Sequence, residues 1–211
     1  ITASPQITSV LDEISCDSFQ LASLPGVTNA GGNLRYYAST GGMFTNGDSL
    51  RVGDWITADA TIFLMDSTNT TPSCSDEISF DVTINTTPEI ALVNDTSNCD
   101  SYALPLLPSL ANGGGNLSYY TGTNKGGSVL TSGDVINTVG TTTVFVYDET
   151  GTTPNCINEI SFDVTITASP QITSVLDEIS CDSFQLASLP GVTNAGGNLR
   201  YYASTGGMFT N

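Results

Sequence analysis

The chain has 211 residues and a formal net charge of −17, because 21 acidic residues face only four basic ones. A surface this acidic repels nucleic-acid phosphates and anionic lipids, so we expect neither nucleic acid as a partner nor insertion into a membrane. The absence of histidine removes the commonest general base and the commonest metal ligand, and no apolar run approaches the ~18 residues of a transmembrane helix.

Strand signals recur along the chain, whereas helix signals are almost absent. Short runs rich in Val, Ile, Thr, Tyr and Phe are separated by Gly, Asn, Asp and Pro, which is typical of short strands and turns. Before position 84 these runs predict strands at Gln6–Val10, Asp17–Leu21, Leu34–Ala38, Met43–Thr45, Asp54–Thr57, Thr61–Asp66 and Ile78–Ile84. ISFDVTI alternates apolar and polar residues and predicts a half-buried strand, while the more apolar TIFLMDS suits a central strand.

The sequence repeats itself at two levels. Residues 1–46 return without a change as residues 166–211, an offset of 166 − 1 = 165. A weaker repeat of about 82 residues lies inside this period, and its matching segments are DEISFDVTI with NEISFDVTI, GGNLRYY with GGNLSYY, and TPSC with TPNC. Self-similarity at a fixed period predicts a tandem array.

Three modules follow from these matches: residues 1–83, residues 84–165, and the first half of a third module at residues 166–211. About seven short strands per module predict an all-β fold of tandem immunoglobulin-like antiparallel β-sandwiches. Asn-Thr-Thr-Pro at 85–88 and Thr-Ala-Ser-Pro at 167–170 join the modules without glycine, and proline favours extended backbone. We therefore expect modules placed end to end on stiff joints, with neighbouring repeats as partners and lateral self-association into a fibre as a further expectation.

Each complete module contains two cysteines that are far apart and lack CxxC spacing, which indicates disulfides and an oxidising, extracellular compartment. The predicted pairs are Cys16–Cys74 and Cys99–Cys156, with the partner of Cys181 beyond the chain end. Each pair would close a loop whose chain-entropy stabilisation is roughly 4 kcal/mol. Buried free thiols are the alternative.

Catalysis has little support, and we expect no enzyme and no cofactor. The acidic pairs Asp12/Glu13 and Asp76/Glu77 are replaced by Asp95/Thr96 and Asn158/Glu159 in the second module, so neither pair recurs. Calcium remains a candidate ligand, because acidic extracellular β-modules bind it through oxygen atoms. The candidate ligands are Asp54, Asp66, Asp134 and Asp148, and the alternative is that these acids hold turns.

Paired tyrosines are candidates for surface contacts. Neighbouring strand residues face opposite sides, so one residue of Tyr36/Tyr37 and one of Tyr119/Tyr120 should be exposed. Outward tyrosines could contact a glycan or another surface, or they could pack across strands. Met43 and Phe44, in a loop that the second module shortens, could form a sticky tip or fill the core.

Several motifs carry a resemblance to a known family. The pattern CDSY-L-L, GG-YY, GD-I, T-FVYDETGTTPNC and NEISFDVTI resembles a repeat of very large secreted proteins of gliding Bacteroidetes, especially flavobacteria. The first module departs from this pattern with FLMDST in place of FVYDET. The resemblance implies type IX secretion, a cell-surface location and a role in adhesive filaments, and it carries no catalytic residue.

The resulting hypothesis is a structural stalk of a filamentous surface adhesin that serves attachment or gliding. The alternative is a carbohydrate-binding module repeated for avidity. A lectin array should present a groove lined by Tyr or Trp on every module. Trp55 is replaced by Val135 in the second module, which argues against a repeated Trp platform.

Overall fold

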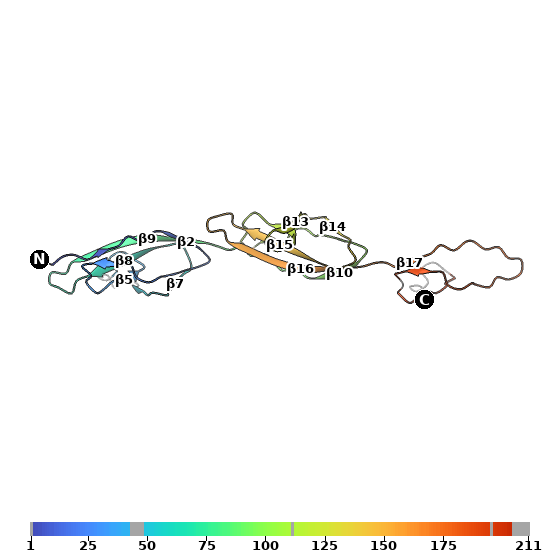
Figure 1. Cartoon of the computed structure of the whole chain (residues 1–211), viewed down its shortest axis with the longest axis horizontal. Coiled ribbons are helices and arrows are strands. Elements are labelled where there is room, and N and C mark those ends of the chain that lie inside the picture. The colour runs from blue at the N-terminus through green and yellow to red at the C-terminus, as the bar shows by residue number, and fades with distance from the viewer. Residues whose placement is uncertain (1, 43–48, 111, 195, 204–211) are drawn as a thin grey trace. The chain divides into compact units, whose positions relative to one another are not determined.

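The computed structural model describes residues 2–42, 49–110, 112–194 and 196–203. Every element with described bounds is a β-strand, and the strands are numbered β1 to β18 along the chain (Figure 1). Within the described residues, no helix has the length and apolar character needed to cross a membrane. The predicted all-β class is therefore confirmed.

The chain forms two compact units. The first comprises residues 1–93, 107–130 and 145–161, and the second comprises residues 94–106, 131–144 and 162–211. Below, residues 1–83 are called the first repeat, residues 84–165 the second repeat and residues 166–211 the third segment. The connection from the first repeat to the second lies inside the first unit.

The main sheet of the first repeat has five strands in the order β2-β9-β8-β5-β6. Their bounds are β2 Glu13–Cys16, β5 Arg35–Tyr37, β6 Ser49–Leu50, β8 Ala60–Ser67 and β9 Ser75–Asn85. All neighbours in this sheet are antiparallel except β2 and β9, which are parallel. Two short antiparallel pairs complete the repeat: β1 (Gln6–Ile7) with β4 (Val27–Thr28), and β3 (Phe19–Gln20) with β7 (Trp55–Ile56).

The second repeat follows the same topology, with a five-stranded sheet in the order β10-β16-β15-β12-β13. Its strands are β10 Thr96–Cys99, β11 Tyr102–Ala103, β12 Ser118–Gly122, β13 Gly126–Leu130, β14 Val135–Ile136, β15 Gly140–Glu149 and β16 Ile157–Thr167. The pair β10–β16 is parallel, and β11 pairs with β14. In the third segment β17 (Gln171–Ile172) pairs with β18 (Val192–Thr193).

The core of the first repeat lies between its five-stranded sheet and the short strand pairs. Its buried members are Ile7, Leu21, Tyr36, Ile62, Leu64, Phe80 and Val82. Along β9 buried residues alternate with exposed ones, which confirms the predicted half-buried strand. Strand β8 is mostly buried and occupies the centre of the sheet, as its apolar sequence predicts. This packing of sheet against strand pairs confirms the β-sandwich.

One prediction about the strands is wrong in a way that matters for the cysteines. Of the predicted strand Asp17–Leu21 only β3 (Phe19–Gln20) forms, because Asp17 adopts a left-handed φ of 59°, and the strand β2 that ends at Cys16 was not predicted. Strand β2 also makes the sheet mixed, whereas an antiparallel sandwich was expected. The predicted strand Met43–Thr45 lies outside the described residues.

A buried carboxylate fixes the same loop in both repeats. Asp66, at the end of β8, is fully buried and accepts hydrogen bonds from the backbone amides of Gly31 (2.7 Å), Asn33 (2.8 Å) and Ser67 (2.9 Å). Burying a charge is costly unless such donors surround it, so the loop and the aspartate stabilise each other.

The second repeat shows the same clamp. Asp148 is fully buried and accepts from the amides of Gly114 (2.8 Å) and Asn116 (2.9 Å). The recurrence of GGN in the two repeats has a steric reason as well. A Cβ on Gly114 would lie 1.9 Å from the carbonyl oxygen of Glu149, so the loop can approach the end of the strand this closely only if residue 114 is glycine.

Replacing Gly31 with alanine should therefore destabilise the first repeat. The new Cβ would lie 2.0 Å from the Ser67 carbonyl oxygen, which is backbone and cannot move aside cheaply. We expect a loss of about 2 kcal/mol or more in the free energy of unfolding, measured by urea denaturation. Gly26→Ala is the matched control, because its Cβ would meet Thr8 at an ordinary 3.6 Å. Equal urea midpoints for the two variants would contradict the clamp.

Candidate functional site

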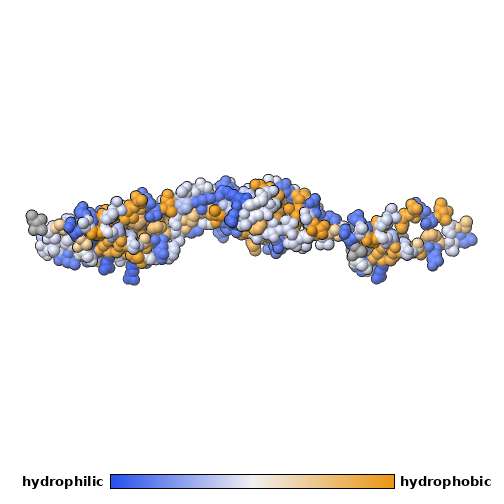
Figure 2. All heavy atoms as spheres, in the orientation of Figure 1, coloured by the Kyte–Doolittle hydropathy of each residue, from blue (hydrophilic) through white to orange (hydrophobic). Residues whose placement is uncertain are grey.

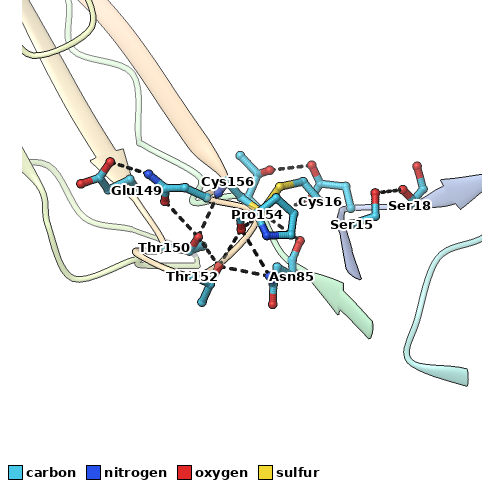
Figure 3. The surroundings of a disulfide bond; sticks show 12 residues. Ser15, Cys16, Ser18, Asn85, Glu149, Thr150, Thr152, Pro154 and Cys156 are labelled. Atoms are coloured by element: carbon cyan, nitrogen blue, oxygen red, sulfur yellow. Dashed lines mark hydrogen bonds between the residues drawn. A yellow bond between two sulfur atoms is a disulfide. The ribbon is translucent and has the colours of Figure 1, made fainter. Parts of the chain in front are cut away.

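A disulfide bond joins the first repeat to the second. Cys16, the last residue of β2, is bonded to Cys156, which directly precedes β16, with their Cα atoms 5.7 Å apart (Figure 3). The two cysteines are 140 residues apart in sequence, and both belong to the first compact unit. The predicted pairing within each module is therefore wrong.

The long strand β9 explains why Cys16 and Cys74 cannot bond. Cys74 precedes the first residue of β9, whereas Cys16 lies opposite its last residue, Asn85. At ~3.3 Å per residue this separates the two cysteines by roughly 36 Å along the strand. A disulfide requires Cα atoms about 4.4–6.8 Å apart.

The same geometry overturns the predicted Cys99–Cys156 pair. Cys99 lies opposite Thr167, the last residue of β16, while Cys156 precedes the first residue of that strand. Cys74, Cys99 and Cys181 carry free thiols. Each module therefore has one cysteine at each end of its long strand, and the observed bond spans the joint.

A second interaction ties the end of β2 to the segment that connects the repeats. The left-handed turn at Asp17 directs its backbone amide to the carbonyl oxygen of Asn85 (2.9 Å). The Asp17 carboxylate accepts hydrogen bonds from the amide (2.8 Å) and the hydroxyl (2.6 Å) of Thr87. These bonds, the side-chain one first, hold the pKa of Asp17 below its usual range.

The connection after the second repeat has the same lock. Asp100 has a φ of 64°, and its amide donates to the carbonyl oxygen of Thr167 (2.9 Å). Its carboxylate accepts from the hydroxyl (2.5 Å) and the amide (2.7 Å) of Ser169, which lower the pKa of Asp100. The aspartate lock is thus common to both connections, independent of the disulfide.

The second repeat contributes a loop that lies against the connecting segment (Figure 3). The side-chain amide of Asn85 donates to the hydroxyl of Thr152 (3.1 Å), and the Cys156 sulfur lies 3.6 Å from the Asn85 carbonyl oxygen. Two bonds between Thr150 and Cys156, each 3.0 Å, close this loop. Cys156 is only 1% exposed, so its side of the disulfide is shielded from solvent.

The tyrosine pairs are buried, which corrects the prediction that one member of each pair faces outward. Tyr36 and Tyr37 are both 4% exposed. Tyr36 packs in the core against Phe80, with ring centroids 6.3 Å apart. Tyr37 points to the other side of the sheet, where Gly42 packs against it. A Cβ added to Gly42 would lie 2.2 Å from the Tyr37 ring. A loop therefore covers the face that was expected to be open.

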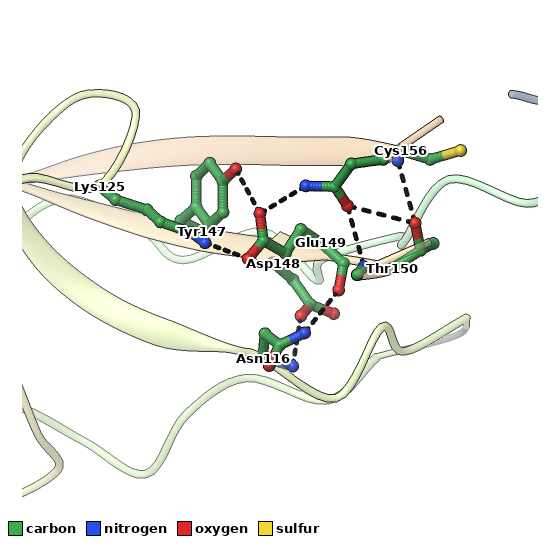
Figure 4. A network of polar contacts seen from close by, with 9 residues as sticks. Asn116, Lys125, Tyr147, Asp148, Glu149, Thr150 and Cys156 are labelled. Carbon is green, nitrogen blue, oxygen red and sulfur yellow. Dashed lines mark hydrogen bonds and ion pairs between the residues drawn. The ribbon is translucent and has the colours of Figure 1, made fainter. Parts of the chain in front are cut away.

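The second repeat covers this face with a polar network (Figure 4). Tyr119 and Tyr120 are also buried, and Tyr120 packs edge-on against Tyr147 at 6.0 Å. The Lys125 ammonium lies 5.0 Å from the centroid of the Tyr147 ring and pairs with Glu149. This pairing lowers the pKa of Glu149 and raises that of Lys125. The four tyrosines thus stabilise the modules and present no contact surface.

Met43 and Phe44 lie outside the described residues.

The four calcium candidates hold backbone loops. Asp66 and Asp148 form the clamps described above, Asp54 accepts from the amide of Arg51 (2.8 Å), and Asp134 accepts from that of Thr131 (2.6 Å). In the part of the chain that the structure describes, no three His, Cys, Asp or Glu side chains gather as a metal site requires.

The acidic pairs considered for catalysis also bind backbone amides. Asp12 accepts from the amide of Asp81 (2.8 Å), and Asp76 accepts from that of Ile7 (2.7 Å). Glu77 accepts from the amide of Gly41 (2.6 Å). Carboxylates engaged in this way position loops and strand edges. The joint between the first and second repeats therefore remains the candidate functional site.

No protein-family model matches the chain, and no curated protein matches it. Solved structures with a similar fold include titin domains I67–I69 in an E-to-A mutated variant, at 9% identity and a TM-score of 0.40, over 82% of this chain and 69% of that one. Cadherin domains 1–5 of protocadherin gamma B2 match at 11% identity and a TM-score of 0.34, over 77% and 40% of the two chains. Mouse cadherin-23 domains 22–24 match at 12% and 0.33, over 81% and 70%.

The chain spans between 34% and 52% of the length of the first three structures that it matches. Likenesses at these identities concern the fold alone.

Tryptic mapping without reduction should establish the cysteine pairing. Cleavage after Arg35, Arg51, Lys125 and Arg200 places Cys16 in peptide 1–35, Cys156 with Cys181 in peptide 126–200, and Cys74 with Cys99 in peptide 52–125. After free thiols are alkylated, we expect peptide 1–35 linked to peptide 126–200, and fragmentation of the linked peptides should place the alkyl group on Cys181 and the bond on Cys156. A link between peptides 1–35 and 52–125 would restore the pairing within the module.

Acid should weaken both aspartate locks. The pKa values of Asp17 and Asp100 are lowered in the folded chain, so their stabilisation is present above the unfolded pKa, about 3.9, and is lost as the pH falls through the lower folded values. Carboxyl-carbon NMR titration should show both midpoints below 3.9, with the Thr87 and Ser169 amide shifts moving together with them. In Asp17→Asn the step at Thr87 should vanish while that at Ser169 stays. Midpoints at the ordinary value would contradict the locks.

Proposed function

We propose that the chain is part of a load-bearing shaft, a structural repeat array of an extracellular filamentous adhesin. The observation that carries the proposal is the Cys16–Cys156 bond, which fastens one repeat to the next. A disulfide within each module would strengthen the modules singly, whereas a disulfide across the joint protects the connection between them.

The bond changes which residues can be stretched. When tension acts on the two chain ends, it passes from Cys16 directly through the sulfur atoms to Cys156. Residues 17–155 then lie on a closed loop and cannot extend, even if their strands separate. The array keeps its length under a pull that would unravel an unbonded chain.

The proposal includes a location and a source. The Cys16–Cys156 disulfide suits an oxidising exterior, where disulfides persist. The resemblance to repeats of giant adhesins of gliding Bacteroidetes supports export by type IX secretion and a role in attachment or gliding. Neighbouring repeats are the primary partners, and lateral association would thicken the fibre.

The carbohydrate-binding alternative receives less support. Its binding surface was expected from outward tyrosines, but Tyr36, Tyr37, Tyr119 and Tyr120 are at most 9% exposed. Trp55 is 60% exposed on β7, yet a valine occupies the corresponding position of the second repeat. Avidity requires the same contact on each module, and neither aromatic type supplies it.

Force spectroscopy tests the proposed load path. With handles at both chain ends, reduction should release the 140-residue loop and add roughly 480 Å of contour length, at ~3.3–3.6 Å per residue. The oxidised chain should resist extension beyond residues 1–16 and 156–211.

Cys156→Ser is the matched variant, because it should give the long contour length without reductant. Cys74→Ser removes a thiol that is free in this chain and should leave the short contour length unchanged. The load-path proposal is wrong if oxidised and reduced chains extend equally.

A further inference from the structure

We propose that the joint after the second repeat is a second disulfide site, in which Cys99 bonds a copy of Cys74 from the following repeat. The two free thiols are thus complementary halves of one kind of joint. An array of residues 1–165 would then carry a covalent bond at every joint, alternating between Cys16–Cys156 and Cys99 with the next Cys74.

The Cys99 half matches the bonded Cys16 half. Cys99 ends β10, which pairs in parallel with β16 so that Cys99 lies opposite Thr167, as Cys16 lies opposite Asn85. The next residue is in each case an aspartate with a left-handed φ, 59° and 64°, whose carboxylate locks the connecting segment. The backbone therefore presents Cys99 at its joint as it presents Cys16.

The Cys74 half matches the bonded Cys156 half. The Cys74 amide donates to the hydroxyl of Thr68 (2.9 Å), as the Cys156 amide donates to that of Thr150 (3.0 Å). The Cys74 sulfur lies 3.9 Å from the carbonyl oxygen of Thr2, and the Cys156 sulfur lies 3.6 Å from that of Asn85. Thr2 corresponds to Asn85 in the repeat, so Cys74 faces the start of its own repeat as Cys156 does.

One contact differs between the joints. Asn85 donates through its side chain to Thr152, whereas Thr2 and Thr167 have no side-chain amide at this position. The second joint thus relies on the aspartate lock and the sulfur atoms without this hydrogen bond.

The third segment shows what completes the joint. Its sequence is identical to residues 1–46, but its apolar side chains lie at the surface (Figure 2). Leu186 is 59% exposed where the identical Leu21 is 1% exposed, and Tyr201 is 41% exposed where Tyr36 is 4% exposed. Strands β8 and β9 cover these side chains in the first repeat. A copy of residues 47–83 would therefore bury them and supply the matching cysteine.

With both kinds of disulfide present, the shaft would contain two continuous covalent paths along its length. Cys99 lies inside the loop that Cys16 and Cys156 close, so successive loops would overlap along the sequence. The backbone stretch from Cys74 to Cys99 has the same length as the stretch from Cys156 to Cys181. Each path would cross one 165-residue period of the array through one such stretch of backbone and one disulfide bond.

The test extends the full chain at residue 211 by a copy of residues 47–83, in a Cys74→Ser background. Refolding with oxidised glutathione supplies a disulfide oxidant. The Cys99 thiol and the added thiol lose two protons and two electrons and form one S–S bond, and the oxidant is reduced to two thiols. Tryptic mapping then follows, with the Cys16–Cys156 link between peptides 1–35 and 126–200 as the internal standard.

We expect peptide 52–125 to be linked to the C-terminal peptide that carries the added cysteine, with loss of alkylated Cys99. In Cys99→Ser that link should vanish while the internal standard stays. Hydrogen exchange should show the third repeat protected like the first in both variants. Alkylated Cys99, a link from Cys181 to the added cysteine, or an unprotected third repeat would each overturn the proposal. The mapping reads only which sulfur atoms are bonded, so its failure leaves the shaft function to the force measurement.

Discussion

The parallel pairing of β2 with β9 is the constraint on which the joint depends. It places Cys16 beside the last residue of the longest strand in the first repeat, next to the segment that leads into the second repeat. Because Cys74 stands at the other end of that strand, the Cys16 sulfur lies next to Cys156 of the second repeat and far from Cys74. The disulfide across the joint follows from this strand geometry and the limited reach of an S–S bond.

The joint combines interactions of different strength and persistence. The Asp17 carboxylate is exposed, so water competes for its hydrogen bonds and such contacts open readily under load. Their contribution is to orient the backbone so that the two sulfur atoms meet. The covalent bond then constrains the unfolded chain, and for a loop of 140 residues the chain-entropy estimate is about 5 kcal/mol. Hydrogen bonds therefore set the geometry of the joint, and the disulfide makes the joint resistant to separation.

Sequence patterns predicted the parts of the fold that depend on local periodicity. The alternation in β9 and the apolar run in β8 each describe which faces of a strand are buried. Cysteine pairing depends instead on which end of a sheet a residue reaches, and in the four-residue strand β2 the apolar Ile14 is exposed, so its sequence pattern does not show where the strand lies. The tyrosine prediction assumed a bare outer face, but the loop at Gly42 and the Lys125 network cover it. Spacing along one chain does not record such long-range coverage.

These contacts explain what many of the acidic residues do in the structure. Asp66 and Asp148 each accept hydrogen bonds from backbone amides inside a module, while Asp17 and Asp100 accept from amides at the connections. A module built from short strands and glycine-rich loops leaves many such amides, and a carboxylate binds them more strongly than a neutral acceptor. These acceptors stabilise each small core locally, and at the first joint the Asp17 lock and the Asn85–Thr152 hydrogen bond are noncovalent, whereas the Cys16–Cys156 bond is covalent. In the shaft that we propose, the position of that bond, more than the stability of any single module, therefore determines the response to tension.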